Sequence, residues 1–161
     1  MTFVRRGLME RGLAVLLSES DAEKELLQQA ATFSDCSDAP LTVLAVVSPS
    51  EYDSVAETMD LIGEIEHTSY DDDAIFEGLR KNTRDIVEDA IGDMDVPYEI
   101  AVQVEDESDR ADVVLTAARE HDCDHVFLVG QRRSPTGKAL FGDLTQKIIL
   151  NFEGDITLSM E

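Results

Sequence analysis

Apolar residues in the chain gather in five short clusters, which are separated by longer stretches of mixed composition. Continuous apolar runs at Leu13–Leu17, Leu41–Val47 and Val126–Val129 are typical of parallel strands buried on both faces. Tyr98–Val104 alternates in part between apolar and polar residues, and Gly154–Met160 forms the last cluster. The pattern therefore predicts five strands.

The stretches between these clusters repeat apolar residues every three or four positions, the spacing of an amphipathic helix. Ser20-Asp21-Ala22-Glu23 is a capping box that predicts the start of the first helix, and Ser34–Pro40 is expected to be a turn-rich connection. Asp73–Met94 is the clearest helix, whereas Ser50–Asp73 supports only a short one. Strand and helix alternate, which favours a parallel sheet with helices on both faces, in a single domain over residues 1–161.

Val126–Asn151 combines a strand, a glycine turn, a basic loop and the start of a helix. Gly130 ends the strand, Gln131–Lys138 is the predicted loop, and Phe141-Gly142-Asp143 opens the helix. A helix N-terminus presents free backbone N–H groups and the positive end of the helix dipole, so this stretch predicts an anion site. Six of the 13 basic residues lie in or near it: Arg110, Arg119, Arg132, Arg133, Lys138 and Lys147.

The charge of the chain is strongly negative, with 35 Asp and Glu residues against 13 Lys and Arg and a net charge of -22. Such a surface repels nucleic acid and anionic membranes at low salt. It suits molar salt, where the Debye length is about 3 Å and carboxylate repulsion is screened. We therefore expect a halophile's protein that does not bind nucleic acid, with an ordinary acidic protein as the alternative.

The sequence contains no recognisable signal for a membrane or for export. It has no run of about 18 apolar residues that could span a bilayer, and Met1–Glu10 lacks the apolar segment of a secretion signal. Cys36 and Cys123 have neither metal-site nor redox spacing, so both are expected to be buried thiols in a reducing compartment. These features indicate a cytoplasmic protein.

Arg119–Gly130, followed by the helix that begins near Gly142, resembles the universal stress protein family. The resemblance extends from Leu13 to Met160 and suggests an acidic, haloarchaeal-type member. It implies a five-stranded parallel sheet of order 3-2-1-4-5, a stress-linked role in the cytoplasm and a homodimer formed through the C-terminal strand. This order reverses between the first and fourth strands, so a ligand is expected at their carboxyl ends.

The resemblance also implies a nucleotide site, although the chain departs from the family's ATP-binding pattern of Gly-x2-Gly-x9-Gly followed by Ser or Thr. Gly130 and Gly142 match the outer glycines with a gap one residue short, whereas Arg133 stands at the middle one. Asp143 replaces the small hydroxyl residue. Ser18-Glu19-Ser20 stands where the family has Asp-Gly-Ser, so the aspartate that recognises adenine is absent.

The candidate site joins the positions that match the family to the two arginines of the loop. Val46 can offer backbone groups to a base, and Thr145 matches a phosphate contact of the family. The complete candidate set is Ser18, Ser20, Val46, Gly130, Arg132, Arg133, Gly142, Asp143, Leu144 and Thr145.

Two possible functions differ in the role that they give to Asp143. As the helix N-cap, its carboxylate would take the place of a phosphate and repel a triphosphate. Arg132 and Arg133 could bind a ligand's anion, or pair with Asp143 and Glu19 in a site filled by the chain itself. The protein is then either a regulatory protein that binds ATP or another adenine nucleotide, or a nucleotide-free homodimer that binds an unidentified protein.

The sequence shows no catalytic arrangement. Its histidines form no Ser-His-Asp or Cys-His set, and His121, Cys123 and His125 lack a fourth ligand for zinc. We therefore expect neither an enzyme nor a metal site, with slow ATP hydrolysis left open.

We predict that the fold is stabilised by salt. The Debye length is about 3 Å near 1 M salt and about 10 Å at 0.1 M, so lowering the salt spreads carboxylate repulsion across the whole surface. The melting temperature, followed by circular dichroism at fixed pH, should rise over this range of KCl concentration. A melting temperature that does not change would contradict the prediction.

Overall fold

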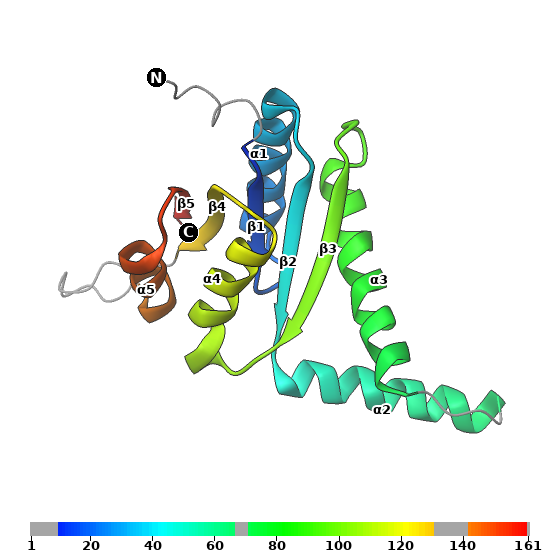
Figure 1. Ribbon diagram of the computed structural model, residues 1–161. Helices are drawn as coiled ribbons and strands as arrows, with labels where there is room; N and C mark the ends of the chain where they lie inside the picture. Colours follow the sequence, from blue (N-terminus) through cyan, green and yellow to red (C-terminus); the bar gives the residue numbers. More distant parts are fainter. Residues whose placement is uncertain (1–9, 67–70, 131–141, 161) are drawn as a thin grey trace, which may run out of the picture.

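The computed structural model describes residues 10–66, 71–130 and 142–160. Their strands form one parallel sheet in the order β3-β2-β1-β4-β5, as predicted (Figure 1). The strands are Gly12–Leu16 (β1), Leu41–Val47 (β2), Tyr98–Val104 (β3), His125–Gly130 (β4) and Asp155–Met160 (β5).

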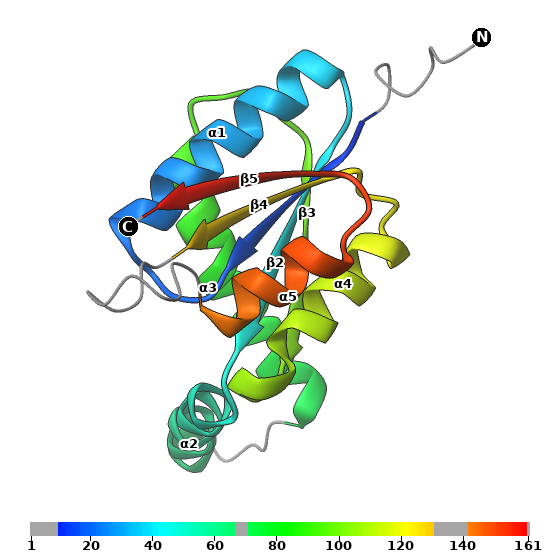
Figure 2. The same ribbon diagram turned by 90° about the vertical axis from the view of Figure 1, so that its left-hand side faces the viewer.

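Helices cover both faces of this sheet, which confirms the predicted fold class (Figure 2). One face carries α1 and α3, and the other carries α4 and α5; α2 follows β2 and projects beyond the sheet (Figure 1). None of the helices in the described ranges is long and apolar enough to cross a membrane. The helices are Asp21–Ser37 (α1), Pro49–Glu66 (α2), Asp72–Ile91 (α3), Arg110–Glu120 (α4) and Asp143–Asn151 (α5).

The two central strands, β1 and β2, are buried along their whole length, as their apolar runs predict. Successive side chains of a strand point to opposite faces. Leu13 and Val15 therefore pack under α4, whereas Ala14 and Leu16 pack under α1. Each fully buried leucine or valine contributes about 1.5–3 kcal/mol, so these short strands hold both helical layers in place.

Two helices end at positions other than those predicted. α1 continues through the expected turn to Ser37 and stops where Asp38 adopts a left-handed conformation, with φ of 55°. α3 ends at Ile91, before Met94, because Gly92 caps it and the chain then turns. The turn-rich composition of Ser34–Pro40 thus predicted too early an end for α1, whereas Gly92 is the local residue that marks the end of α3.

α2 is longer than its weak periodicity predicts, with 18 residues. Val55 and Met59 of α2 pack against α3 beside Gly78. The second half exposes Leu61 and Ile65. This contact with α3 explains a helix that the sequence indicates only in part.

The two cysteines differ in their surroundings. Cys123 is buried, as expected, and burial raises the pKa of its thiol to about 11, so it is protonated near neutral pH. Cys36 is exposed near the end of α1, because it follows the buried Ser34 by two positions and therefore lies on the opposite, outer side of the helix. The prediction that both thiols are buried was therefore wrong for Cys36.

His125 begins β4 and joins three elements of the fold. Its ring stacks on Phe127, with centroids 4.3 Å apart, and lies 4.6 Å from the ring of Phe33 on α1. Nε2 is 2.7 Å from Thr157 Oγ1 on β5, whereas Nδ1 is buried without a hydrogen-bond partner. Burial lowers the pKa of His125, so the folded state favours the neutral ring.

We predict that this histidine makes the fold less stable as the pH falls below about 6.5, the pKa of an unfolded histidine. Burial outweighs the attraction of Asp155 and Glu10, so the folded pKa lies below the unfolded one. The unfolded state then takes up the proton first, and stability is lost between the two pKa values.

The variant His125→Gln keeps a hydrogen-bonding group near Thr157 but cannot be protonated. Its melting temperature should depend less on pH than that of the native protein between about pH 7.5 and 5.5, at fixed high salt. Equal slopes for the native protein and His125→Gln would rule out this role.

Candidate functional site

A cleft of about 660 Å³ lies at the carboxyl ends of β1 and β4, where the strand order reverses. Helices in this fold run back against the strands, so α1, α4 and α5 all begin at this edge of the sheet. The cleft is lined by Leu17, Ser18, Ser20, Glu23, Glu107, Ser108, Arg110, Ala111, Val129, Gly142, Asp143, Leu144, Thr145 and Lys147.

The helix α5 begins at this cleft without a capping side chain. Gly142 is the N-cap, in an extended conformation, and Asp143 is the first helical residue. The first backbone bond of the helix joins Gln146 N to Gly142 O at 3.0 Å. The N–H groups of Asp143, Leu144 and Thr145 therefore have no partner within the helix.

The prediction that Asp143 is the N-cap was therefore wrong by one position. A glycine has no side chain that can accept the first N–H groups, and Asp143 lies exposed at the rim of the cleft. Its charge still complements the helix dipole from the first turn. Among the described residues, no side chain caps the start of α5 at the cleft, and a carboxylate lies beside it.

A buried carboxylate closes the end of β1. Glu23 is 3% exposed, and its Oε2 accepts a hydrogen bond from Leu17 N at 2.8 Å. Its Oε1 accepts from Ser18 N at 2.9 Å and from Ser18 Oγ at 3.4 Å. The backbone N–H groups that follow β1 are therefore bound by the chain's own side chain.

The serine half of the predicted capping box forms beside this carboxylate. Ser20 Oγ accepts a hydrogen bond from Glu23 N at 3.2 Å, as the motif requires. The Glu23 side chain, however, reaches past Ser20 to the end of the strand. No motif signals this contact, because the Ser-x-x-Glu pattern predicts a bond from the glutamate back to the N-cap residue and not to the end of the strand.

Two cations line the described part of the cleft, and they differ in their partners. Lys147 Nζ lies 3.1 Å from Asp112 Oδ1, in an exposed ion pair; such pairs contribute at most about 1 kcal/mol. Arg110 opens α4 and makes no hydrogen bond or ion pair with residues in the described ranges. Its Nε is buried and has no hydrogen-bond partner.

Most of the residues predicted for the site meet in this cleft. Those that line it are Ser18, Ser20, Gly142, Asp143, Leu144 and Thr145.

The remaining predicted residues lie elsewhere or are not described. Gly130 ends β4 directly after Val129, which lines the cleft. Val46 is 2% exposed and packs in the core beneath α4, without lining the cleft. Arg132 and Arg133 lie outside the described residues. The two loop arginines therefore stay predictions.

Sequence reasoning placed Arg110 and Lys147 near the anion site without including them in the candidate set, and it missed Glu23 and Glu107 as lining residues of the cleft. Arg110 could have been found from its place at the start of a helix, because every helix N-terminus in this fold lies at the carboxyl edge of the sheet. No comparable signal exists for Lys147, since only the packing of α5 beside α4 brings it to the cleft.

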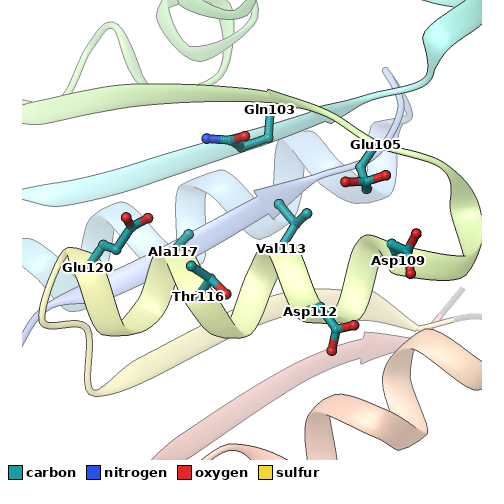
Figure 3. Close-up of a pocket in the computed structure, with 8 residues that line it drawn as sticks. All are labelled: Gln103, Glu105, Asp109, Asp112, Val113, Thr116, Ala117 and Glu120. Atoms are coloured by element: carbon teal, nitrogen blue, oxygen red, sulfur yellow. The ribbon is translucent and has the colours of Figure 1, made fainter.

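A second cleft, of about 470 Å³, lies between β3 and α4 (Figure 3). Glu105, Asp109, Asp112 and Glu120 surround the apolar surface of Val113 there, and no basic residue is part of its described lining. Four carboxylates disfavour an anionic ligand. The first cleft, which has cations and an open helix N-terminus, is therefore the candidate ligand site.

His121, Cys123 and His125, which were considered as zinc ligands, each contact a different group. His121 Nδ1 lies 3.0 Å from Glu99 Oε1, whereas His125 Nε2 is bound to Thr157. Cys123 Sγ lies 3.7 Å from the His121 carbonyl oxygen. Within the described ranges, no group of three His, Cys, Asp or Glu residues is placed to hold a metal ion.

Comparison with known proteins gives one family and one fold. The family model of the Universal stress protein family matches residues 11–158. No curated protein matches the sequence significantly. A universal stress protein from Archaeoglobus fulgidus has a similar structure, with a TM-score of 0.61 and 22% identity, covering 93% of this chain and 97% of that one.

Two similar structures contain nucleotides. A universal stress protein in complex with cAMP has a TM-score of 0.58 and 14% identity, covering 94% of this chain and 98% of that one. The Archaeoglobus fulgidus protein in complex with dAMP has a TM-score of 0.58 and 18% identity, covering 93% and 96%. At these identities the likeness shows the shared fold.

We predict that Glu23→Ala destabilises the protein more than an ordinary surface change. Loss of the carboxylate leaves the N–H groups of Leu17 and Ser18 without their acceptor, so the free energy of unfolding should fall by about 2–4 kcal/mol. This corresponds to a decrease in melting temperature of roughly 5–15 °C for a chain of this size.

Glu25→Ala is the matched control, because it removes the same charge from an exposed position of α1. Its melting temperature should stay close to the native value at the same molar salt concentration. If the two alanine variants melt at the same temperature, Glu23 does not hold the end of β1.

Proposed function

The chain belongs to the universal stress protein family, and on that premise we propose that it is a small regulatory protein that binds an adenine nucleotide. The observation that carries this proposal is the cleft at the ends of β1 and β4, over the N-terminus of α5. Ligands of open α/β sheets bind in this crevice, and the free N–H groups of a helix start suit a phosphate. Relatives that hold cAMP or dAMP support the same class of ligand.

We expect the site to be a degenerate form of an ATP site. Ser18 offers no carboxylate to a base, and the N–H groups of Leu17 and Ser18 are already bound to Glu23. Asp143 adds a negative charge beside the phosphate seat. These features favour weak binding, while Gly142 leaves the start of α5 open to an anion.

Glu23 also supports a second candidate function, that of a nucleotide-free interaction protein. In this case the chain fills its own site from the β1 side through Glu23, and Asp143 with Arg132 and Arg133 fills it from the other. The function then resides in a homodimer and in its binding of another protein. Retention of nucleotide separates the two candidates.

Neither candidate requires rapid chemistry. The lining of the cleft, in the part that the structure describes, contains no histidine or cysteine that could act as a general base or nucleophile. We therefore infer a binding protein, with slow ATP hydrolysis as the remaining catalytic alternative. The net charge of -22 supports a place in the cytoplasm of a salt-adapted organism, without nucleic acid as a partner.

We predict that protein purified gently in high salt carries an adenine nucleotide on only a small fraction of its chains, detectable by mass spectrometry after denaturation, because the binding is weak. Calorimetric titration with ATP at fixed high salt should show weak binding, which Asp143→Ser improves about tenfold. Removal of a like charge about 4 Å from a phosphate contributes about 1–4 kcal/mol before screening, and tenfold corresponds to about 1.4 kcal/mol.

The double variant Arg132→Ala with Arg133→Ala is the control and should lose affinity for ATP. Absence of nucleotide after purification, together with no binding by either the native chain or Asp143→Ser, would favour the nucleotide-free candidate. Tight native binding that Asp143→Ser weakens would show that Asp143 helps to hold the ligand.

We also predict a homodimer formed through β5. This strand pairs with β4 and ends the sheet of the described residues, and an uncovered edge strand tends to pair with another chain. Ile149 and Leu150 on α5 and Met160 on β5 are exposed, which supplies apolar surface near the edge. Light scattering at micromolar concentration in high salt should give twice the chain mass of 17.8 kDa; a monomer would refute the dimer.

A further inference from the structure

Arg110 has an unusual position among the charged residues of the cleft. It is the first residue of α4, and it lines the same cleft as Gly142–Thr145, which open α5. Arg110 lies outside the glycine pattern of Gly130 and Gly142, so that pattern does not indicate it as a site residue. Its role has to be argued from its surroundings.

The fold gains little from this side chain. A positive charge at a helix N-terminus opposes the helix dipole. Arg110 makes no ion pair or hydrogen bond with residues in the described ranges, and burial removes water from its Nε without replacing it by an acceptor. All three features work against the folded state, so stability does not explain the residue.

The neighbouring cations have partners that Arg110 lacks. Lys147 in the same cleft is paired with Asp112, and Arg119 on the same helix donates a hydrogen bond from Nη2 to Thr116 Oγ1 at 3.3 Å. The described lining otherwise carries the carboxylates of Glu23, Glu107 and Asp143. An anion that enters this cleft therefore meets Arg110 as a cation still free to bind it.

We propose that Arg110 is a ligand-binding residue that holds the phosphate of the bound nucleotide, together with the free N–H groups of α5. The guanidinium presents several donors in a planar fork that matches two oxygens of a phosphate. The N–H groups of Asp143, Leu144 and Thr145 supply further donors to the same anion. This assignment rests on the proposed function, since it names the residue that selects a phosphorylated ligand at that site.

The test compares AMP with adenosine, which lacks the phosphate. Calorimetric titration at fixed high salt should show that Arg110→Gln weakens AMP binding about tenfold and leaves adenosine binding unchanged. Arg110→Lys should restore part of the AMP affinity. The melting temperature of Arg110→Gln without ligand should equal or exceed the native value, because the helix loses an unfavourable charge.

Arg119→Gln is the matched control, with the same change of charge on the same helix, and should bind AMP as the native chain does. Equal AMP affinity in the native chain and Arg110→Gln overturns the assignment and leaves the proposed function intact. Equal loss of AMP and adenosine affinity also overturns it, since Arg110 then acts on the shape of the cleft. A native chain that binds neither ligand refutes the proposed function and the assignment together.

Discussion

Burial of β1 and β2 on both faces is the constraint on which the rest of the structure depends. A strand that is covered above and below must pair its backbone groups within the sheet. Helices must then cross over each face, and each returns so that its N-terminus lies at the carboxyl edge. The open N–H groups at the starts of α1, α4 and α5 thus gather at one edge, and the cleft follows from the architecture before any ligand is considered.

The groups that lie at the helix N-termini along this edge differ from one helix to the next. At α1, Ser20 and Glu23 bind backbone N–H groups, so the chain supplies its own acceptors. At α5, Gly142 supplies none, and at α4 an arginine stands without a partner in the described structure. On one side of the cleft the protein therefore supplies its own acceptors, whereas on the other the described residues leave backbone N–H groups and an arginine without them, in a molecule of strongly negative net charge.

The sheet could be predicted from the sequence because its signals are strong and local. Leu41–Val47 and Tyr98–Val104 are observed with the predicted bounds, since each apolar segment follows a proline at its start. The end of α1 could not be predicted in this way. Ser34 is buried although its composition suggests a turn, and contact between Phe33 and Phe127 keeps the last turns of the helix against the sheet.

The features of the site can also be divided into those that the sequence predicts and those that it does not. The start of α5 was visible in the order of glycines and apolar residues, but the reach of Glu23 to the end of β1 depends on a rotamer that no motif encodes. Arg110 enters the cleft only because the crossover after β3 brings α4 beside α5. Arguments from periodicity place elements along the chain, whereas the first of these contacts depends on a side-chain conformation and the second on how distant elements meet.

The glycine that begins α5 has a consequence for how such a protein changes over evolutionary time. A serine or asparagine at Gly142 could accept hydrogen bonds from the first N–H groups of the helix. These groups would then need no external anion. A glycine leaves the same groups to whatever anion the cell provides. A single substitution at this position would therefore decide whether the chain itself caps the start of α5, without any rearrangement of the sheet.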